Sequence, residues 1–198
     1  LQRFEQLHPQ VTVKVHEVAR EAIEEGLITQ RYDIGVVLTS NVVLRELSLE
    51  TFFGSQRRLW VPAKHPLLDK AEVTLADVAA EPYIMLTVDE AAATALKYWS
   101  KTPHQPQIRL RTSSVEAVRS TVANGLGVTV LSDMVYRPWS LEGKRIETIN
   151  LRDAVPTMNI GLGWKQGVEF SPAMTAFRNY FRQLFLEPAS GRTGRGRG

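Results

Sequence analysis

The sequence predicts an α/β protein made of two lobes, and three observations lead to this prediction. Short apolar runs such as "IGVVL" and "GVTVL" alternate with helical patterns, which is typical of parallel strands covered by helices on both faces. The order helix, strand, helix, apolar strand occurs in residues 1–38 and again in residues 87–131. A chain of 198 residues is long enough for two small lobes.

The first lobe begins with a helix, because Leu1, Phe4 and Leu7 recur with helical period before "HPQ" stops the pattern. The run "VTVKV" alternates valine with polar residues and predicts a half-exposed strand. A short helix with Val18 and Leu27 on one side comes next, and then a buried strand. The four predicted elements occupy, in order, residues 1–8, 11–15, 17–33 and 34–38.

The second lobe repeats this alternation and carries clear helix signals. Thr74 with Asp77 caps one short helix, and two capping boxes, T-x-x-E from Thr87 and S-x-x-E from Ser113, open two longer ones. Gly125 is expected to stop the last of these helices. The strands are predicted at residues 57–68 (broken by prolines), 83–86, 107–111 and 128–131, and the helices at 73–82, 87–100 and 113–125.

The chain is expected to end with a short helix near "DMVYRPW", two strands and a long helix. The strands are "KRIETINL" and "TMNIGLGW". Ser171 is expected to cap the final helix, and Pro172 occupies its first turn.

Charge and cysteine content exclude several classes of protein. The chain has no cysteine, so disulfides and thiolate metal sites are excluded. The net charge of +3 comes from Arg192, Arg195 and Arg197 in the glycine-rich end "GRTGRGRG", which predicts a disordered basic tail. The remaining chain shows no basic stripe for nucleic acid, and its apolar runs are too short to span a membrane.

Small hydroxyl residues follow three of the predicted strands. Thr87 and Ser113 follow strands of the second lobe, and Thr39 with Ser40 follows "IGVVL" in the first. A helix start offers free N–H groups and the positive end of its dipole, so hydroxyls placed there suit an anion. For any one of these residues a plain N-cap is the simpler interpretation, since serine and threonine are strongly preferred there, and it is the coincidence of three such strand ends that favours a binding site.

An enzyme is not favoured by the sequence. The four histidines lie in unrelated contexts without metal spacing, and no nucleophile elbow, phosphate-binding loop or zinc-protease motif occurs. His65 in "AKHPLL" lies near a predicted lobe crossing, but a histidine in a turn explains it as well. The glycines of "GLGVTVL" precede a strand, which is typical of a helix-ending turn and not of a nucleotide loop.

Taken together in order, several segments resemble the effector-binding domain of LysR-type transcriptional regulators. The matching segments span roughly residues 1–185: "FEQLHPQVTVKVHE", "YDIGVVL", "RLWVPAKHPL", "VTLADVAAEPYIML", "SSVEAVRSTVANGLGVTVLS" and "IGLGWKQGVEFSPAMTAFRNYFRQLF". The resemblance implies a type II periplasmic-binding-protein fold with two Rossmann-like lobes joined by two crossover strands. Lobe one would comprise residues 1–62 and 158–185 and lobe two residues 63–157, followed by a disordered tail at 186–198.

The function that the resemblance implies is effector sensing, with a small anionic molecule bound in the cleft between the lobes. No cofactor, metal or catalytic residue is expected. Thr129 is expected to point either into the core or toward the cleft. The ligand-binding residues carried over by position are Thr39, Ser40, Ala63, His65, Leu86, Thr87, Val88, Ser113, Ser114 and Thr129. A solute-binding protein of a transport system is the alternative function, and an enzyme on the same fold is a third.

The resemblance also implies partners. The winged helix-turn-helix of the family and the opening strand of lobe one have no counterpart here, so we expect the chain to be part of a longer protein that binds DNA through that absent domain. A homodimer or tetramer, a small-molecule effector and RNA polymerase are the expected partners, in the cytoplasm and without a membrane. In the dimer, residues 1–15 of one subunit would pack on residues 87–111 of the other.

Overall fold

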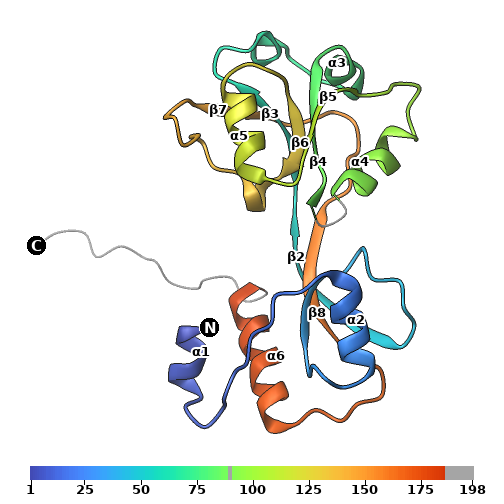
Figure 1. Cartoon of the computed structure of the whole chain (residues 1–198), viewed down its shortest axis with the longest axis vertical. Helices are drawn as coiled ribbons and strands as arrows, with labels where there is room; N and C mark the ends of the chain where they lie inside the picture. Colours follow the sequence, from blue (N-terminus) through green and yellow to red (C-terminus); the bar gives the residue numbers. More distant parts are fainter. Residues whose placement is uncertain (89–90, 186–198) are drawn as a thin grey trace, which may run out of the picture. The chain divides into compact units, whose positions relative to one another are not determined.

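The structure is a computed structural model that describes residues 1–88 and 91–185. It divides into two units, which Figure 1 shows with their helices and strands. Unit 1 contains Leu1–Gly54 and the chain from Asn159 onward, and unit 2 contains Ser55–Met158. The predicted tail at 186–198 lies outside the described residues.

Unit 1 is a three-stranded sheet flanked by helices. Its elements are α1 (Gln2–Leu7), α2 (Arg20–Ile28), β1 (Gly35–Leu38), β2 (Leu47–Ser55), β8 (Met158–Lys165) and α6 (Pro172–Phe185). The strands lie in the order β1-β8-β2, and β1 pairs with β8 in antiparallel fashion. The parallel pairing that the sequence predicts is therefore wrong for β1.

Two predictions for unit 1 need correction. The strand at 11–15 is wrong, since residues 11–19 form neither helix nor strand and Val15 is 69% exposed. Alternation of valines supplies one apolar face, but a strand also needs a neighbour for its backbone, and none of β1, β8 or β2 pairs with this segment. Strand β2 was not predicted from the sequence, and its buried and exposed residues alternate irregularly.

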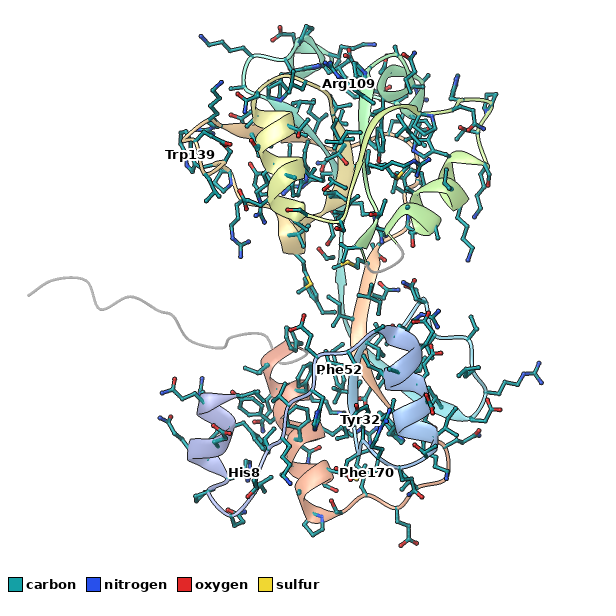
Figure 2. The ribbon with its side chains drawn as sticks, in the orientation of Figure 1. His8, Tyr32, Phe52, Arg109, Trp139 and Phe170 are labelled. Atoms are coloured by element: carbon teal, nitrogen blue, oxygen red, sulfur yellow. The ribbon has the colours of Figure 1, made fainter. Side chains whose placement is uncertain are left out.

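Helix α6 holds unit 1 together through aromatic side chains and one carboxylate. Phe177 contacts Phe4 of α1 edge to face with a centroid distance of 5.2 Å, and Phe181 lies 5.7 Å from Phe52 of β2, which Figure 2 labels. On β2, Glu50 accepts hydrogen bonds from two arginines of α6. The predicted cap is confirmed, because the Ser171 hydroxyl accepts from the N–H of Met174 at 3.2 Å.

Unit 2 contains the longer run of alternating strands and helices. Its elements are β3 (Arg57–Pro62), the 3-10 helix η1 (Pro66–Asp69), α3 (Leu75–Ala79), β4 (Pro82–Leu86), α4 (Ala91–Trp99), β5 (Gln107–Thr112), α5 (Val115–Ala123), β6 (Thr129–Ser132), the 3-10 helix η3 (Asp133–Val135) and β7 (Ile146–Ile149). Because β3 pairs with β6 and β7, it belongs to unit 2, although the sequence placed residues up to Pro62 in the first lobe.

The strands of unit 2 form one continuous layer in the order β5-β4-β6-β3-β7. β4 and β5 are parallel, as predicted, and β3 is antiparallel to both β6 and β7. The two groups are linked at the start of β6, where the N–H of Ile84 donates to the carbonyl of Val128 at 2.9 Å in a parallel bridge. β4, β5 and β6 therefore run in the same direction, and their carboxyl ends lie at one edge of the layer.

The two faces of this layer are covered by different helices. Tyr83 and Met85 of β4 point into a core with α3 and α4, whereas Ile84 and Leu86 point into a second core with α5. In Figure 1 α5 lies over one face of these strands. Alternate residues of a strand point to opposite faces, so an apolar run without polar interruption serves both cores.

The helix caps agree with the sequence in one case and differ in another. Thr74 and Asp77 form the predicted capping box. At α5 the cap is Ser114, whose hydroxyl accepts from the N–H of Ala117 at 3.2 Å, and not Ser113. Gly125 ends α5 with φ +74, as predicted. The box predicted from Thr87 to Glu90 reaches residues outside those that the structure describes.

Candidate functional site

Thr87 and Ser113 lie next to each other at the carboxyl ends of two neighbouring strands. The last residues of β4 and β5, Leu86 and Thr112, are paired in the parallel ladder. The N–H of Thr87 donates to the carbonyl oxygen of Thr112 at 2.9 Å, which fixes the first residue after each strand beside the other. Both residues are exposed. This edge, defined by Thr87 and Ser113, is called the strand-end site below.

The start of α5 leaves Ser113 available to a ligand. Ser114 performs the capping, and its own N–H donates to the Thr112 hydroxyl at 3.1 Å. Because Ser114 caps the helix, the Ser113 hydroxyl is not used for that purpose. The first N–H groups of an α-helix have no acceptor within the helix, and the helix dipole makes this end positive. The strand-end site thus combines hydroxyl donors with partial positive charge.

A further pair of hydroxyls, which the sequence did not predict, lies at the end of β6. Ser132 is 3% exposed and its hydroxyl donates to the Ser55 hydroxyl at 2.7 Å. The N–H of Met134 lies 3.2 Å from the Ser132 oxygen. The signal was present in "VTVLS", which ends an apolar strand with serine in the way that "RLRTS" does. These hydroxyls bind one another and the start of η3, so they serve mainly to shape the edge.

Arg57 lies at the same edge and was also missed. It opens β3 and is paired with Ser132 in the antiparallel ladder, so the start of β3 coincides with the end of β6. Its guanidinium donates to the carbonyl of Pro156. Burial lowers the pKa of Arg57, and the nearby Tyr98 and Tyr83 partly oppose that effect. The doublet "RR" at a strand start gave no sign of which arginine pairs with a carboxylate, as Arg58 does with Asp133.

Three other predicted residues, on or next to β4 and β6, have a packing role. Thr129 is fully buried and its hydroxyl donates to the carbonyl of Ile84 at 2.8 Å, so of its two predicted directions it takes the core. Leu86 is 5% exposed and belongs to the core beneath α5. Val88 is half-buried and packs against the same core.

Ala63 and His65 lie at the opposite edge of the layer. β3 runs antiparallel to β6, so its end at Pro62 is at the edge where β4 begins. His65 accepts from the N–H of Leu67 at 3.3 Å through Nδ1 and opens η1, and its Nε2 lies 3.7 Å from the carboxylate of Glu81, next to the start of β4. The histidine is thus a turn residue. The sequence placed both residues with Thr87, but strand direction separates them.

In unit 1, Thr39 and Ser40 follow β1 as predicted. The N–H of Thr39 donates to the carbonyl of Asn159 at 2.9 Å, and its hydroxyl lies 2.7 Å from that of Thr51. Thr39 is 9% exposed, whereas Ser40 is exposed. The Thr39 hydroxyl therefore already has a partner within the sheet.

Within residues 1–88 and 91–185, no cluster of three or more potential metal ligands occurs. In the same residues, no helix combines the length and the hydrophobicity that crossing a lipid bilayer requires.

Comparisons with known proteins identify the family. A family profile described as "LysR substrate binding domain" matches residues 1–186. The RuBisCO operon transcriptional regulator of Allochromatium vinosum is 25% identical over 180 residues, which cover 89% of this chain and 58% of that regulator. The chain thus spans a little over half the length of this relative.

Solved structures show the same fold. The BenM effector binding domain with its effector benzoate has a TM-score of 0.78 and 18% identity, and the match covers 95% of this chain and 87% of that one. The effector binding domain of QuiR in complex with shikimate has a TM-score of 0.71 and 17% identity, covering 93% and 88%. These neighbours have the predicted type II periplasmic-binding-protein-like fold. The chain belongs to the LysR substrate-binding domain family of transcriptional regulators.

Proposed function

We propose that this chain is the effector-sensing part of a LysR-type regulator and that it binds a small organic anion at the strand-end site. The observation that carries this proposal is the hydrogen bond from the N–H of Thr87 to Thr112, which holds Thr87 beside Ser113. The exposed hydroxyls of Thr87 and Ser113 and the first N–H groups of α5 are then hydrogen-bond donors that lie close together at the strand-end site. Hydroxyls turn their donors toward a carboxylate, and a helix start favours negative charge.

The class of ligand is supported by the two solved neighbours that carry effectors in their titles. Benzoate is bound to BenM and shikimate to QuiR. Both molecules are carboxylates at neutral pH, and both are small. A carboxylate offers two acceptor oxygens, which matches a site rich in donors.

A ligand can regulate transcription only through its different affinities for two conformations of the regulator. In this proposal the anion stabilises one conformation, and a DNA-binding domain outside the present chain reads the change. Contacts with DNA and RNA polymerase, a homodimer and a cytoplasmic location follow from the family and belong to the same proposal. A transport function is not favoured, because the matched relative is a named transcriptional regulator.

The experiment is a thermal-shift screen of carboxylic acids that includes benzoate and shikimate. A hit should raise the melting temperature of the wild type, and Thr87→Val or Ser113→Ala should reduce that rise. Ser100→Ala is the matched control, since this exposed serine of unit 2 bonds only to the end of α4, at Lys97. The proposal is rejected if no acid stabilises the protein, or if every acid that does so raises the melting temperature of both variants as much as that of the wild type.

Thr39 and Ser40 stay a prediction of the resemblance for unit 1. Ser40→Ala is the better probe of the two, because the Thr39 hydroxyl has a structural partner in Thr51 and its loss would change the sheet as well. A hit from the screen should bind Ser40→Ala more weakly than wild type if the residue contacts the ligand.

A further inference from the structure

Arg57 differs from the other half-buried arginines in having no carboxylate partner. Arg58, the next residue, pairs with Asp133 at 2.6 Å, and Arg119 pairs with Glu116. Within the described part of the chain, no carboxylate lies at ion-pair distance from Arg57, whose guanidinium bonds to the neutral carbonyl of Pro156. A guanidinium has five N–H donors, so most of its capacity is open to a ligand.

Among the residues that the structure describes, the surroundings of Arg57 supply no negative charge either. The ionisable groups that influence it are the phenols of Tyr98 and Tyr83, which lie within hydrogen-bond reach of each other at 3.3 Å. Burial, with the neighbouring Tyr83, raises the pKa of Tyr98 well above its ordinary value, so this phenol is neutral at physiological pH. Burial also lowers the pKa of Arg57, which means that its charge is partly desolvated, and no carboxylate among the described residues pairs with it.

The position of Arg57 brings this charge to the strand-end site. β3 begins where β6 ends, and β6 lies between β3 and β4 in the layer. Neighbouring strands are spaced by roughly 4.8 Å, so the start of β3 and the end of β4 are about 10 Å apart. An extended arginine side chain is long enough to span more than half of that distance, and a ligand the size of one six-membered ring with a carboxylate is long enough to span the rest.

The geometry points to Arg57 as the residue that selects a negatively charged ligand at this site over a neutral one of the same shape. This inference rests on the proposed function. The hydroxyls of Thr87 and Ser113 and the first N–H groups of α5 donate to a carboxylate and to a carboxamide oxygen alike. A guanidinium instead forms two parallel charge-assisted bonds with a carboxylate, and it gains little from an amide.

Arg111 is the competing candidate for this role. It lies on β5, one residue before Thr112, and is therefore near the same edge. Its side chain is exposed, so water and salt screen its charge far more than that of the half-buried Arg57. The two arginines can be separated by mutation.

The test compares acids with their own primary amides. Benzoate, shikimate and phenylacetate are each titrated against benzamide, shikimamide and phenylacetamide, and binding is followed by isothermal calorimetry. Arg57→Gln keeps a donor for Pro156 but removes the charge, and Arg57→Lys keeps the charge. We expect Arg57→Gln to weaken acid binding about 10- to 100-fold, since a charge-assisted bond contributes roughly 1.5–3 kcal/mol, and to change amide binding less than about threefold. The acid affinity of Arg57→Lys should lie between that of the wild type and that of Arg57→Gln.

One control and one competing variant make the outcomes distinct. Arg109, which Figure 2 labels, lies in the irregular part of β5, towards the amino-terminal end of the β4–β5 pair. Arg109→Gln removes the same charge there and should change neither acid nor amide affinity. If no acid binds the wild type, the proposed function fails. If an acid binds and Arg57→Gln keeps its preference for acid over amide, or if Arg111→Gln abolishes that preference instead, the proposed function stands and the role of Arg57 is refuted. Melting temperatures of all variants establish that they are folded.

Discussion

Glu50 ties β2 to α6, and its replacement by glutamine should destabilise unit 1 in a pH-dependent way. The carboxylate accepts from Nε of Arg178 at 2.5 Å and from Nε of Arg182 at 2.6 Å, and its side chain is 18% exposed. A charge-assisted hydrogen bond contributes about 1.5–3 kcal/mol. The arginine side chains are 31% and 43% exposed, and screening by solvent reduces each bond to about 1 kcal/mol.

Glu50→Gln should therefore lower the free energy of unfolding by about 2 kcal/mol at neutral pH. For a chain of this length that corresponds to a fall in melting temperature of roughly 4–8 °C. Urea titration and thermal melts of both proteins measure the difference. Glu169→Gln, at an exposed glutamate of the same unit, is the control and should stay within about 0.5 kcal/mol of wild type.

The pH dependence gives this prediction a second test. Burial by itself raises the pKa of Glu50, but the hydrogen bonds and charges of Arg182 and Arg178 outweigh it and hold the pKa below the ordinary value of 4.5. A carboxyl with a depressed folded-state pKa stabilises the protein above its unfolded pKa, and that contribution is lost as the pH falls through the folded-state pKa. The gap between wild type and Glu50→Gln should thus be constant near neutrality and shrink in acid. Equal stability at neutral pH, or a gap that grows in acid, would refute the reasoning.

Three further substitutions test packing and capping, each by urea unfolding. Ser114→Ala should lower the free energy of unfolding by about 1 kcal/mol because it removes the cap of α5, whereas Ser113→Ala should leave it almost unchanged. The reverse order would contradict the assigned cap. Gly161→Ala should cost roughly 2 kcal/mol or more, because its Cβ would lie 2.0 Å from the carbonyl oxygen of Glu50; a neutral effect would contradict the close approach of β8 and β2. Thr129→Val should cost about 1–2 kcal/mol and leave acid binding unchanged, and a loss of binding would show that the residue contacts ligand.

Local signals predicted unit 2 well. The capping box of Thr74 and Asp77, the stop at Gly125 and the continuous apolar run of β4 each depend on a few neighbouring residues, and the structure contains all three. The cap of α5 shows the limit of such signals. Both serines of "SSVE" satisfy the residue preference, and the choice of Ser114 depends on the Thr112 hydroxyl, which accepts from its N–H.

Strand pairing in unit 1 could not be predicted from local patterns. "VTVKV" has the alternation of a strand, but that pattern contains no information about whether a neighbouring backbone is available. β2 was missed for the opposite reason, because its alternation is irregular while its position next to β8 is fixed by pairing. Hydrogen bonds between residues far apart in sequence decided both cases.

The candidate site was predictable in part. Hydroxyls after apolar strands identified Thr87 and Ser113, whose proximity follows from parallel neighbours. Ala63 and His65 were carried over by position from the family resemblance, and the direction of β3 places them at the opposite edge of the layer. Arg57 could not be singled out, since only the three-dimensional structure shows that it has no carboxylate partner in residues 1–88 and 91–185.

The most direct test of the central claim is an NMR titration of the labelled protein with whichever carboxylic acid most raises its melting temperature. Binding at the strand-end site predicts that the backbone amides of Thr87, Ser113, Val115 and Glu116 shift most among the residues of unit 2, and saturate together. If the acid binds while these four amides stay unchanged and the shifts cluster around Ala63 and His65 at the opposite edge, the claim is contradicted.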